Sequence, residues 1–252
     1  MTDWLIMKIS LITVVYNGEA FLQECFNSVK SQTYPDVEYL VIDGGSKDNT
    51  LGIIAENQAT IHYFVSEADH GLYDAINKGI AKATGDIIGI LNADDMFSRP
   101  DVLAAVAETF KNQPEIAGLH GDLNYIHPVT NKIVRKWRSK NADFRDLAKG
   151  WMPAHPTLYL KRSLFEKHGN YALNLGTTSD YDLILRFLYT HQIKTAYLPM
   201  LMVNMRVGGV SNKSLHNRWL ALVNDYKSLR RNKIPHPFWV LVKKKLSKLR
   251  QF

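Results

Sequence analysis

The segment Asp86-Ile87-Ile88-Gly89-Ile90-Leu91-Asn92-Ala93-Asp94-Asp95 decides the fold class of this 252-residue chain. Residues 87–91 are apolar or glycine, which is typical of a strand buried on both faces in a parallel sheet. Ligands of open α/β sheets bind outside the carboxyl ends of the strands. We therefore expect Asp94 and Asp95 to hold a hard divalent cation that meets substrate phosphates. The alternative is that the two acids only cap the helix that follows Pro100 or solvate a turn.

The residues before this segment alternate between strand and helix patterns. Buried strands are expected at 8–18, where the strand ends in a turn, at 37–42 and at 61–65. Helices are expected between them, with apolar faces at i, i+3 and i+4 spacing: Phe21, Leu22, Cys25, Phe26 and Val29, then Leu72, Ile76 and Ile80. Either Ser46 or Asp48 could cap a helix after the second strand. This β-α-β-α-β-α-β order predicts an α/β fold with a mostly parallel sheet flanked by helices.

The pattern changes after about residue 116. We expect a hairpin from 116–126 and 132–138, a strand at 155–160, helices at 101–110, 163–168 and from 177 onward, and one or two short strands within 195–206. Ser179 and Asp182 form a pair resembling a capping box at the start of the helix after residue 177. Residues 213–252 are expected to be helical, with a break at Pro235-His236-Pro237.

The positive charge of the chain is concentrated at its end. The net charge is +7, yet residues 213–252 carry 11 Lys and Arg against one acid, Asp225, and the preceding residues have a net charge of −3. Such a distribution argues against nucleic acid as a partner of the main domain. It favours an anionic surface as the partner of a basic tail.

Residues 238–246 combine bulky apolar side chains with three lysines. A basic amphipathic helix of this kind is expected on an anionic membrane surface; the alternative is a solvated helix that packs back on the domain. The sequence contains no run of about 18 apolar residues, so no membrane span is predicted. The first residues do not resemble a signal peptide. The lone Cys25 excludes an intramolecular disulfide. We therefore expect a cytoplasmic protein, peripheral on the inner face of the plasma membrane.

Acidic residues follow three of the predicted strands. They are Asp43, the pair Asp69 and Asp74, and the pair Asp94 and Asp95. Because parallel strands share one carboxyl edge, these side chains are expected to converge there. Converging carboxylates repel each other, so the cluster indicates a metal, a ribose or a nucleobase amide as ligand.

Four segments in order resemble the successive signatures of glycosyltransferase family 2. They are Thr13-Val14-Val15-Tyr16-Asn17, Asp43-Gly44-Gly45-Ser46-Lys47-Asp48-Asn49-Thr50, Tyr73-Asp74-Ala75-Ile76-Asn77-Lys78-Gly79 and Asn92-Ala93-Asp94-Asp95. The resemblance extends over residues 9–207. It implies a Rossmann-like GT-A fold, a nucleotide-sugar donor, a divalent metal (Mn²⁺ or Mg²⁺) and inversion at the anomeric carbon.

The resemblance also assigns the nucleotide site. It implies nucleotide-binding roles for Val14, Tyr16, Asp43, Asp74, Asn77, Asn92 and Ala93. Val14 and Tyr16 would line the base pocket, and Asp43 would accept a hydrogen bond from the base. Asn77 could equally be a polar residue on a solvated helix face.

The metal motif departs from the family pattern in one position. Asp94 matches the last acid of the family's Asp-X-Asp motif, whereas Asn92 stands where the first acid is expected. An amide can bond the ribose but brings no charge, so lower metal affinity is expected. Asp95 is the alternative metal ligand.

Ser179-Asp180-Tyr181-Asp182-Leu183 resembles the family's Glu-Asp signature, with Ser179 in the place of the glutamate. An inverting transfer is a single displacement, so one carboxylate must take the proton of the attacking hydroxyl. The resemblance implies that Asp180 is this base. The alternative is that Asp180 and Asp182 only stabilise the helix N-terminus.

Three further residues are candidates for acceptor or diphosphate binding. His155 resembles a histidine that some family members place before the acceptor helix, and a buried structural histidine is the alternative. Trp151 could form a platform for a sugar ring or could simply pack in a loop. Arg206 lies near the family's late basic position and could neutralise the leaving diphosphate.

These expectations combine into one functional prediction. The chain is expected to be an inverting, metal-dependent glycosyltransferase of surface polysaccharide biosynthesis, moving a sugar from a nucleotide-sugar, UDP-sugar favoured, to a glycan or polyprenyl-linked acceptor. The nucleotide half would span about 1–115, the acceptor half about 116–212, and the tail 213–252. Asn92 and Ser179 favour the alternative, a non-catalytic nucleotide- or sugar-binding module of the same fold. A nucleotidyltransferase lacks the expected Gly-rich basic loop after the first strand.

Overall fold

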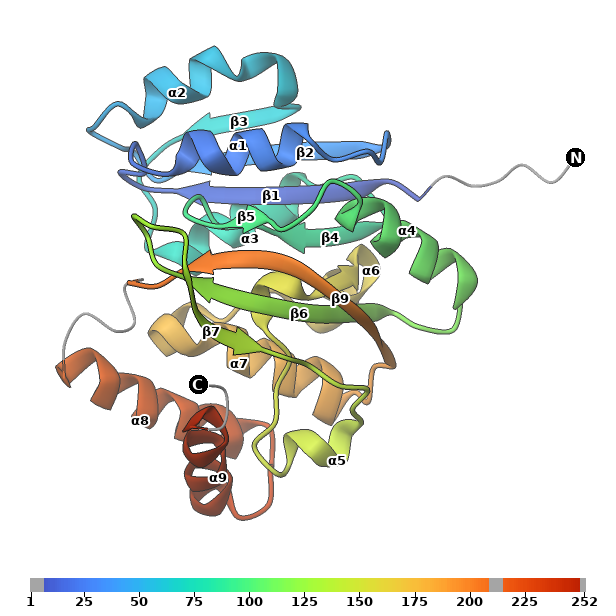
Figure 1. Ribbon diagram of the computed structural model, residues 1–252. Helices are drawn as coiled ribbons and strands as arrows, with labels where there is room; N and C mark the ends of the chain where they lie inside the picture. The colour runs from blue at the N-terminus through green and yellow to red at the C-terminus, as the bar shows by residue number, and fades with distance from the viewer. Residues whose placement is uncertain (1–6, 209–214, 250–252) are drawn as a thin grey trace, which may run out of the picture.

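A computed structural model describes residues 7–208 and 215–249 of the chain. One nine-stranded sheet is flanked by helices (Figure 1), with strand order β3-β2-β1-β4-β8-β6-β9-β5 and with β7 paired to β6. The elements up to the fourth strand are β1 (Ile9–Val15), α1 (Leu22–Lys30), β2 (Val37–Asp43), α2 (Thr50–Glu56), β3 (Tyr63–Ser66), α3 (Leu72–Lys82) and β4 (Ile87–Ile90). The α/β fold class predicted from the sequence is confirmed.

The first four strands are parallel, as predicted. Every residue of β1 and of β4 is buried, because helices cover both faces of this part of the sheet. Successive residues of β1 point to opposite faces of the sheet: Leu11 packs in the core that includes α1 and α4, and Ile12 in the core that includes α3 and α7. The prediction from the apolar run 87–91, a strand buried on both faces, is therefore confirmed.

The second half of the sheet is mixed rather than mostly parallel. Its elements are β5 (Met96–Phe97), α4 (Val102–Asn112), β6 (Gly118–Ile126), β7 (Ile133–Trp137), α5 (Phe144–Leu147), β8 (Tyr159–Lys161), α6 (Arg162–His168), α7 (Ser179–Ile184) and β9 (Thr195–Arg206). Strand β8 is antiparallel to both β4 and β6, and β9 is parallel to β6. Strand β6 therefore runs in the same direction as β4, and the two strands end at the same edge of the sheet.

Two strand predictions in this half differ from the structure. His155–Thr157 is a 3₁₀ turn, and the strand begins only at Tyr159. Pro156 lacks the N–H that a strand would use, and Thr157 Oγ1 is bonded to Ala154 O and Gly121 O instead. The segment predicted as one or two short strands is the single 12-residue strand β9.

The predicted caps were also wrong. Helix α7 begins without a side-chain cap among the described residues; Ser179 Oγ donates to Ala172 O at 2.6 Å, and the buried Asp182 carboxylate accepts from Asn232 at 3.0 Å. At α2, Ser46 Oγ donates to Asp43, and Asp48 accepts from the Thr50 amide at 3.0 Å within a turn. These polar side chains bond more distant partners or close a turn, so they are unavailable as caps.

The predicted C-terminal helices are α8 (Leu215–Arg231) and α9 (Pro237–Leu249). They pack against α7: Lys244 Nζ lies 3.2 Å from the centre of the Tyr181 ring and 3.0 Å from Asp225 Oδ2. Within residues 7–208 and 215–249, the structure holds no helix that is long and apolar enough to cross a membrane. The start of the predicted tail, residues 213 and 214, and its last residues, 250–252, lie outside the described part.

Candidate active site

The carboxyl ends of β1, β2 and β4 form one edge of the sheet, and the loops after them carry the first candidate residues. Val15 pairs with Asp43, and the Gly44 amide bonds Val15 O at 2.9 Å. A Cβ on Gly44 would collide with the Asp69 carboxylate, so the loops after β2 and β3 approach each other closely here. The structure therefore brings the loops after β1, β2 and β3 together, as the parallel order predicts.

Asp43 is fully buried and holds the loop after β2. Its carboxylate accepts hydrogen bonds from the amides of Gly45 and Ser46, at 3.1 and 3.0 Å, and from the hydroxyls of Ser46 and Ser66, at 2.5 and 2.6 Å. In this structure the four donors bond the carboxylate and shape the loop. Its bond to a base stays a prediction.

The other base-pocket candidates differ in exposure. Tyr16 is 63% exposed at the end of β1, whereas Val14 is buried in the core beneath it. The Tyr16 ring is therefore accessible and Val14 supports the strand that precedes it, and the role of both in a base pocket stays a prediction. Ala93 is buried against the loop after β1: a Cβ added to Gly18 of that loop would lie 3.8 Å from the Cβ of Ala93.

The turn after β4 brings Asn92, Asp94 and Asp95 together. Asn92 Nδ2 donates to Asp95 Oδ2 at 3.1 Å, and the Asp95 amide donates to Asn92 O at 3.0 Å. Asn92 Oδ1 and Asp95 Oδ1 are buried and have no hydrogen-bond partner within the described residues. Buried oxygens without partners are rare and indicate a missing ligand, ion or water.

Both acids of this turn are poorly compensated. Burial raises the pKa of Asp94, against the lowering effect of a backbone hydrogen bond and of the Arg206 charge. Burial and then the Asp94 charge raise the pKa of Asp95 well above its ordinary value. A cation between the two carboxylates would reverse both effects.

The donor set fits a hard divalent cation that shares its coordination with a ligand. The part of the chain that the structure describes has no group of three or more His, Cys, Asp or Glu side chains arranged to hold a metal. Mg²⁺ is commonly bound by one or two carboxylates, with substrate phosphates and water completing the shell. Asp94 and Asp95, with the amide oxygen of Asn92, match that arrangement.

Asp180 stands in the first turn of α7, half-buried, beside a group of aromatic residues. Tyr73 of α3 donates to Thr177 O at 3.4 Å and stacks on Tyr171 at 5.3 Å between ring centres. Burial and then the Asp180 charge raise the pKa of Tyr73 well above its ordinary value, which keeps the phenol protonated. Tyr73 was not singled out from the sequence, because it has the helical spacing of a core residue.

His155 and Asn77 both meet Tyr171. His155 Nε2 lies 2.8 Å from the Tyr171 hydroxyl, and burial lowers the pKa of His155 although the Asp180 charge opposes this. Asn77 bonds both backbone groups of Tyr171, its Nδ2 donating at 2.9 Å and its Oδ1 accepting at 3.0 Å. The Asn77 side chain therefore links α3 to the segment before α7, and its contact with a nucleotide stays a prediction.

Asp74 and Trp151 have local partners. Asp74 Oδ2 accepts from the His70 amide at 3.0 Å and lies 3.8 Å from Lys78 Nζ. Trp151 is half-buried, 5.5 Å from the His120 ring between centres, in the segment that packs under α9. Neither contact assigns a ligand to these residues.

Tyr125 is affected by the charges of both Asp95 and Asp180. It lies near the end of β6, with Arg135 Cζ 4.7 Å from its ring centre. Burial raises the pKa of Tyr125; the Arg135 charge lowers it, and the charges of both Asp95 and Asp180 raise it. The turn Asn92–Asp95 and the predicted base Asp180 therefore both lie within electrostatic range of Tyr125, although they are far apart in the sequence.

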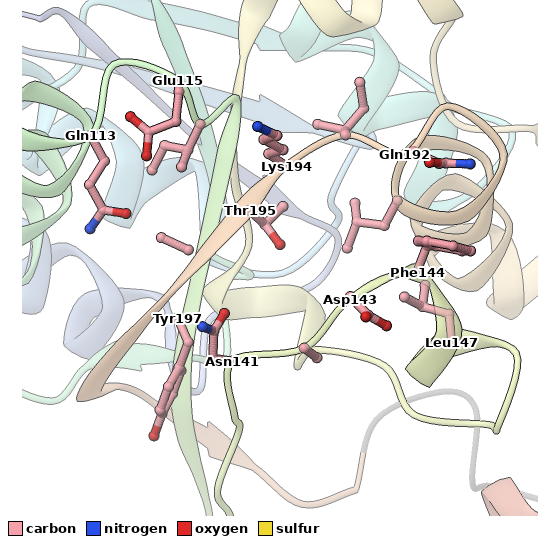
Figure 2. A pocket seen from close by; sticks show the side chains of 15 residues that line it. Gln113, Glu115, Asn141, Asp143, Phe144, Leu147, Gln192, Lys194, Thr195 and Tyr197 are labelled. Atoms are coloured by element: carbon pink, nitrogen blue, oxygen red, sulfur yellow. The ribbon is translucent and has the colours of Figure 1, made fainter.

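A cavity of about 580 Å³ lies at the opposite edge of the sheet (Figure 2). Its lining comes from the beginning of β9, from α5 and from nearby loops, and includes Lys194, Thr195, Tyr197, Phe144 and Leu147. Strands β6 and β9 begin there and end near the acids. The cavity is therefore separate from the site described above.

Comparison with known proteins agrees with this arrangement. The sequence profile of glycosyl transferase family 2 matches residues 10–169. An uncharacterized glycosyltransferase of Mycobacterium tuberculosis is 33% identical over 186 residues, which cover 71% of this chain and 68% of the relative. The PGL/p-HBAD biosynthesis glycosyltransferase of the same species is 31% identical over 215 residues, covering 84% of this chain and 82% of the relative.

Solved structures show the same fold. The chain resembles Staphylococcus aureus TarS in complex with UDP, with a TM-score of 0.71 at 17% identity, covering 95% of this chain and 71% of TarS residues 1–349. It also resembles the Pyrobaculum calidifontis mannosyltransferase PcManGT in complex with GDP-Man and Mn²⁺, with a TM-score of 0.64 at 20% identity, covering 96% and 70% of the two chains. Together, the profile match and the relatives show that this chain is a glycosyltransferase of family 2, with the GT-A fold.

Proposed function

We propose that the protein is an inverting glycosyltransferase that moves a sugar from a UDP-sugar to a glycan or polyprenyl-linked acceptor. The observation that carries this proposal is the turn after β4, where Asn92 and Asp95 each keep a buried oxygen without a hydrogen-bond partner in the described chain. Asp94 stands between them. The complexes of TarS with UDP and of PcManGT with GDP-Man and Mn²⁺ support a nucleotide-sugar donor and a metal for this chain.

In the proposed reaction, Asp180 accepts the proton of the acceptor hydroxyl as that oxygen attacks the anomeric carbon from the face opposite the diphosphate. Asp180 stands in the first turn of α7, close enough to Tyr73 and His155 for its charge to act on the pKa of both. Burial lowers the pKa of His155, so it is expected to be neutral and to leave the base role to the carboxylate. Mn²⁺ or Mg²⁺ held by Asp94 and Asp95 would offset the negative charge of the leaving nucleoside diphosphate.

The alternative is a module that binds a nucleotide without turnover. Asn92 supports it, because the amide brings no charge to the turn Asn92–Asp95, here called the metal turn. Ser179 supports it as a replacement for glutamate. The contacts of both residues weigh against it. Asn92 orients Asp95 through a 3.1 Å hydrogen bond, and Ser179 bonds the segment before α7. Both departures therefore keep a supporting role in the site.

The substitution Asp180→Asn tests the proposal. In a thermal-shift panel of UDP, GDP, CDP and ADP, wild-type protein with Mn²⁺ is expected to gain about 2.7 kcal/mol of stability from one nucleoside diphosphate at 100 times its dissociation constant, and to show a smaller shift with the same nucleotide in EDTA. The variant should show the same shift, because its charge change lies outside the nucleotide loops. Its transfer rate should fall roughly a thousandfold, because an amide cannot accept the proton.

The matched control is Asp101→Asn, which removes an acid at the start of α4 that pairs only locally with Arg99. Its transfer rate should equal that of the wild type. Transfer by the Asp180→Asn variant at the wild-type rate would exclude Asp180 as the base. Nucleotide binding by the wild type without transfer to any acceptor would favour the non-catalytic module.

We further propose that α8 and α9 attach the enzyme to an anionic membrane, where a polyprenyl-linked acceptor would be found. Trp219, Phe238 and Trp239 are 61–63% exposed. In α9, Trp239, Lys243 and Leu246 share one exposed face at i, i+4 and i+7 spacing, whereas Val240 and Lys244 point into the protein. Exposed aromatic rings beside lysines fit the boundary between head groups and acyl chains.

Vesicle sedimentation tests this attachment. The protein is expected to sediment with vesicles containing phosphatidylglycerol, to stay in solution with neutral vesicles, and to be released by salt. The double substitution Phe238→Ser and Trp239→Ser should weaken binding at least tenfold. Val129→Ser, which removes an even more exposed apolar side chain from the β6–β7 loop, should leave binding unchanged. Equal binding by the double variant would contradict the proposal.

A further inference from the structure

Three segments meet on the side chain of Arg206, the last residue of β9. Its guanidinium is 1% exposed. Nη1 donates to the backbone oxygen of Asp94 at 2.8 Å, Nη2 donates to Glu24 Oε2 at 2.6 Å, and the Phe21 ring centre lies 4.5 Å from Cζ. Helix α1, the metal turn and the end of β9 are thus joined by one planar group.

This bonding pattern determines which atoms of the metal turn are held. Arg206 bonds the turn through a main-chain oxygen, that of Asp94. The side-chain oxygens Asn92 Oδ1 and Asp95 Oδ1 have no hydrogen-bond partner within the described structure. A buried guanidinium is costly unless its charge is balanced and its N–H groups are bonded. Nη1 and Nη2 of Arg206 are bonded, whereas Nε has no partner within the described residues. Glu24, on the half-exposed side of α1, supplies the balancing charge.

We propose that Arg206 is a positioning residue that fixes the turn Asn92–Asp95 in its ligand-binding shape, and that Glu24 locks Arg206 in place. The inference rests on the proposed metal and nucleotide site and adds a residue pair that supports it. It gives Arg206 a different task from direct contact with the leaving diphosphate. Nη1 and Nη2 are already engaged by Asp94 and Glu24, so contact with a diphosphate through these two groups would compete with both bonds.

The planar fork of arginine matters for this task. Two N–H groups on one rigid group bond the Asp94 carbonyl and the Glu24 carboxylate at once, whereas a lysine ammonium is a single point on a flexible chain. Residues that orient metal ligands from outside the coordination shell commonly change metal affinity by about 10–100-fold when they are replaced. Loss of either partner should therefore act on the metal and spare the base pocket.

The test measures Mn²⁺ and UDP separately in Arg206→Lys, Glu24→Gln and the double variant. Mn²⁺ affinity is read from the electron paramagnetic resonance signal of free Mn²⁺ in the presence of UDP, and UDP affinity from calorimetry in EDTA. We expect each single variant to weaken Mn²⁺ binding about tenfold, the double variant to weaken it no further, and UDP affinity in EDTA to stay unchanged.

The structure offers a matched control pair. Arg162 also donates to a backbone oxygen, Gly85 O at 3.0 Å, and pairs with the carboxylate of Glu166, but at the amino edge of the sheet. Arg162→Lys and Glu166→Gln make the same chemical changes and should leave Mn²⁺ binding unchanged. Melting temperatures of all variants separate loss of the metal from loss of the fold, and the near-isosteric Glu24→Gln change is expected to fold.

Two outcomes would overturn the proposed positioning role of Arg206 and Glu24. If Arg206 instead binds the diphosphate, Arg206→Lys will weaken UDP binding in EDTA, and Glu24→Gln will strengthen it by releasing the guanidinium. If the turn needs no support, folded variants will bind Mn²⁺ as the wild type does. Failure of the wild-type protein to bind Mn²⁺ with UDP would be a different result, because it would refute the proposed metal site itself.

Discussion

The two ends of the parallel sheet treat buried carboxylates in opposite ways. At the amino end of β2, Glu38 accepts hydrogen bonds from Lys8 Nζ at 3.1 Å, Ser10 Oγ at 2.5 Å, and the amide and hydroxyl of Thr84 at 2.8 and 2.6 Å. At the carboxyl end of β4, Asp95 accepts one side-chain hydrogen bond, from Asn92, and its Oδ1 has no partner in the described chain.

Both carboxylates are buried, at 9% and 1% exposure, so burial alone does not separate them. Burial opposes ionisation of Glu38, but its four hydrogen bonds outweigh burial and lower its pKa to about 2. Burial and the Asp94 charge raise the pKa of Asp95 well above its ordinary value. One end of the sheet is therefore completed by the chain itself, and the other is left for a ligand to complete.

The largest expected effect comes from Asp95→Asn. The variant should lose Mn²⁺-dependent UDP binding, and its transfer rate should fall at least a hundredfold, because a charged oxygen ligand is removed. Its free energy of unfolding should rise by about 1 kcal/mol, because the repulsion between Asp94 and Asp95 disappears from the folded state. Calorimetric titration and urea unfolding measure the two effects.

Asp86→Asn is the control for this variant, since Asp86 precedes the same strand and accepts from the Lys8 amide at the opposite end, at 3.0 Å. Its transfer rate should match that of the wild type. A loss of stability in Asp95→Asn would contradict the comparison, because it would show that the Asp95 carboxylate contributes to the fold as Glu38 does.

The parallel half of the fold was readable from the sequence because its signals are local. Each buried run is followed within a few residues by its polar loop, so β1, β2, β3 and β4 could be predicted as parallel strands, with Asp94 and Asp95 at their carboxyl edge. The geometry of a parallel sheet then determines which strand ends meet. Short-range patterns therefore suffice for this part.

The rest depends on partners far apart in the chain. Glu24 has the spacing of an ordinary solvated helix residue, yet it bonds Arg206, which lies 182 positions later. Asn77 bonds Tyr171 across 94 positions, and Ser179 bonds Ala172 rather than its own helix. No local pattern reveals such pairs, because they depend on where the end of β9 meets the first turn of α1 and where the segment around Tyr171 packs on α3.

A smaller effect is expected from Glu38→Gln. The amide cannot accept from all four donors, so about 2 kcal/mol of unfolding free energy should be lost at pH 7. Transfer should continue at the wild-type rate, because Glu38 stands at the amino end of the sheet, away from the acids of the site. Urea unfolding and a transfer assay measure the two properties, and a large loss of transfer in a folded variant would contradict the separation of the two ends.

The pH dependence of these two variants sharpens the comparison further. The pKa of Glu38 is lowered on folding, so its stabilisation is present above the ordinary pKa of 4.5 and is lost as the pH falls toward 2. The stability gap between wild type and Glu38→Gln should therefore close on acidification. The pKa of Asp95 is raised on folding, so the wild type is destabilised as the pH rises above the ordinary value, and the advantage of Asp95→Asn should grow in that direction. Unfolding series between pH 3 and 7 should show gaps of opposite sign that both narrow toward acid; if the Asp95→Asn gap stays constant, Asp95 does not carry the unfavourable charge that we assign to it.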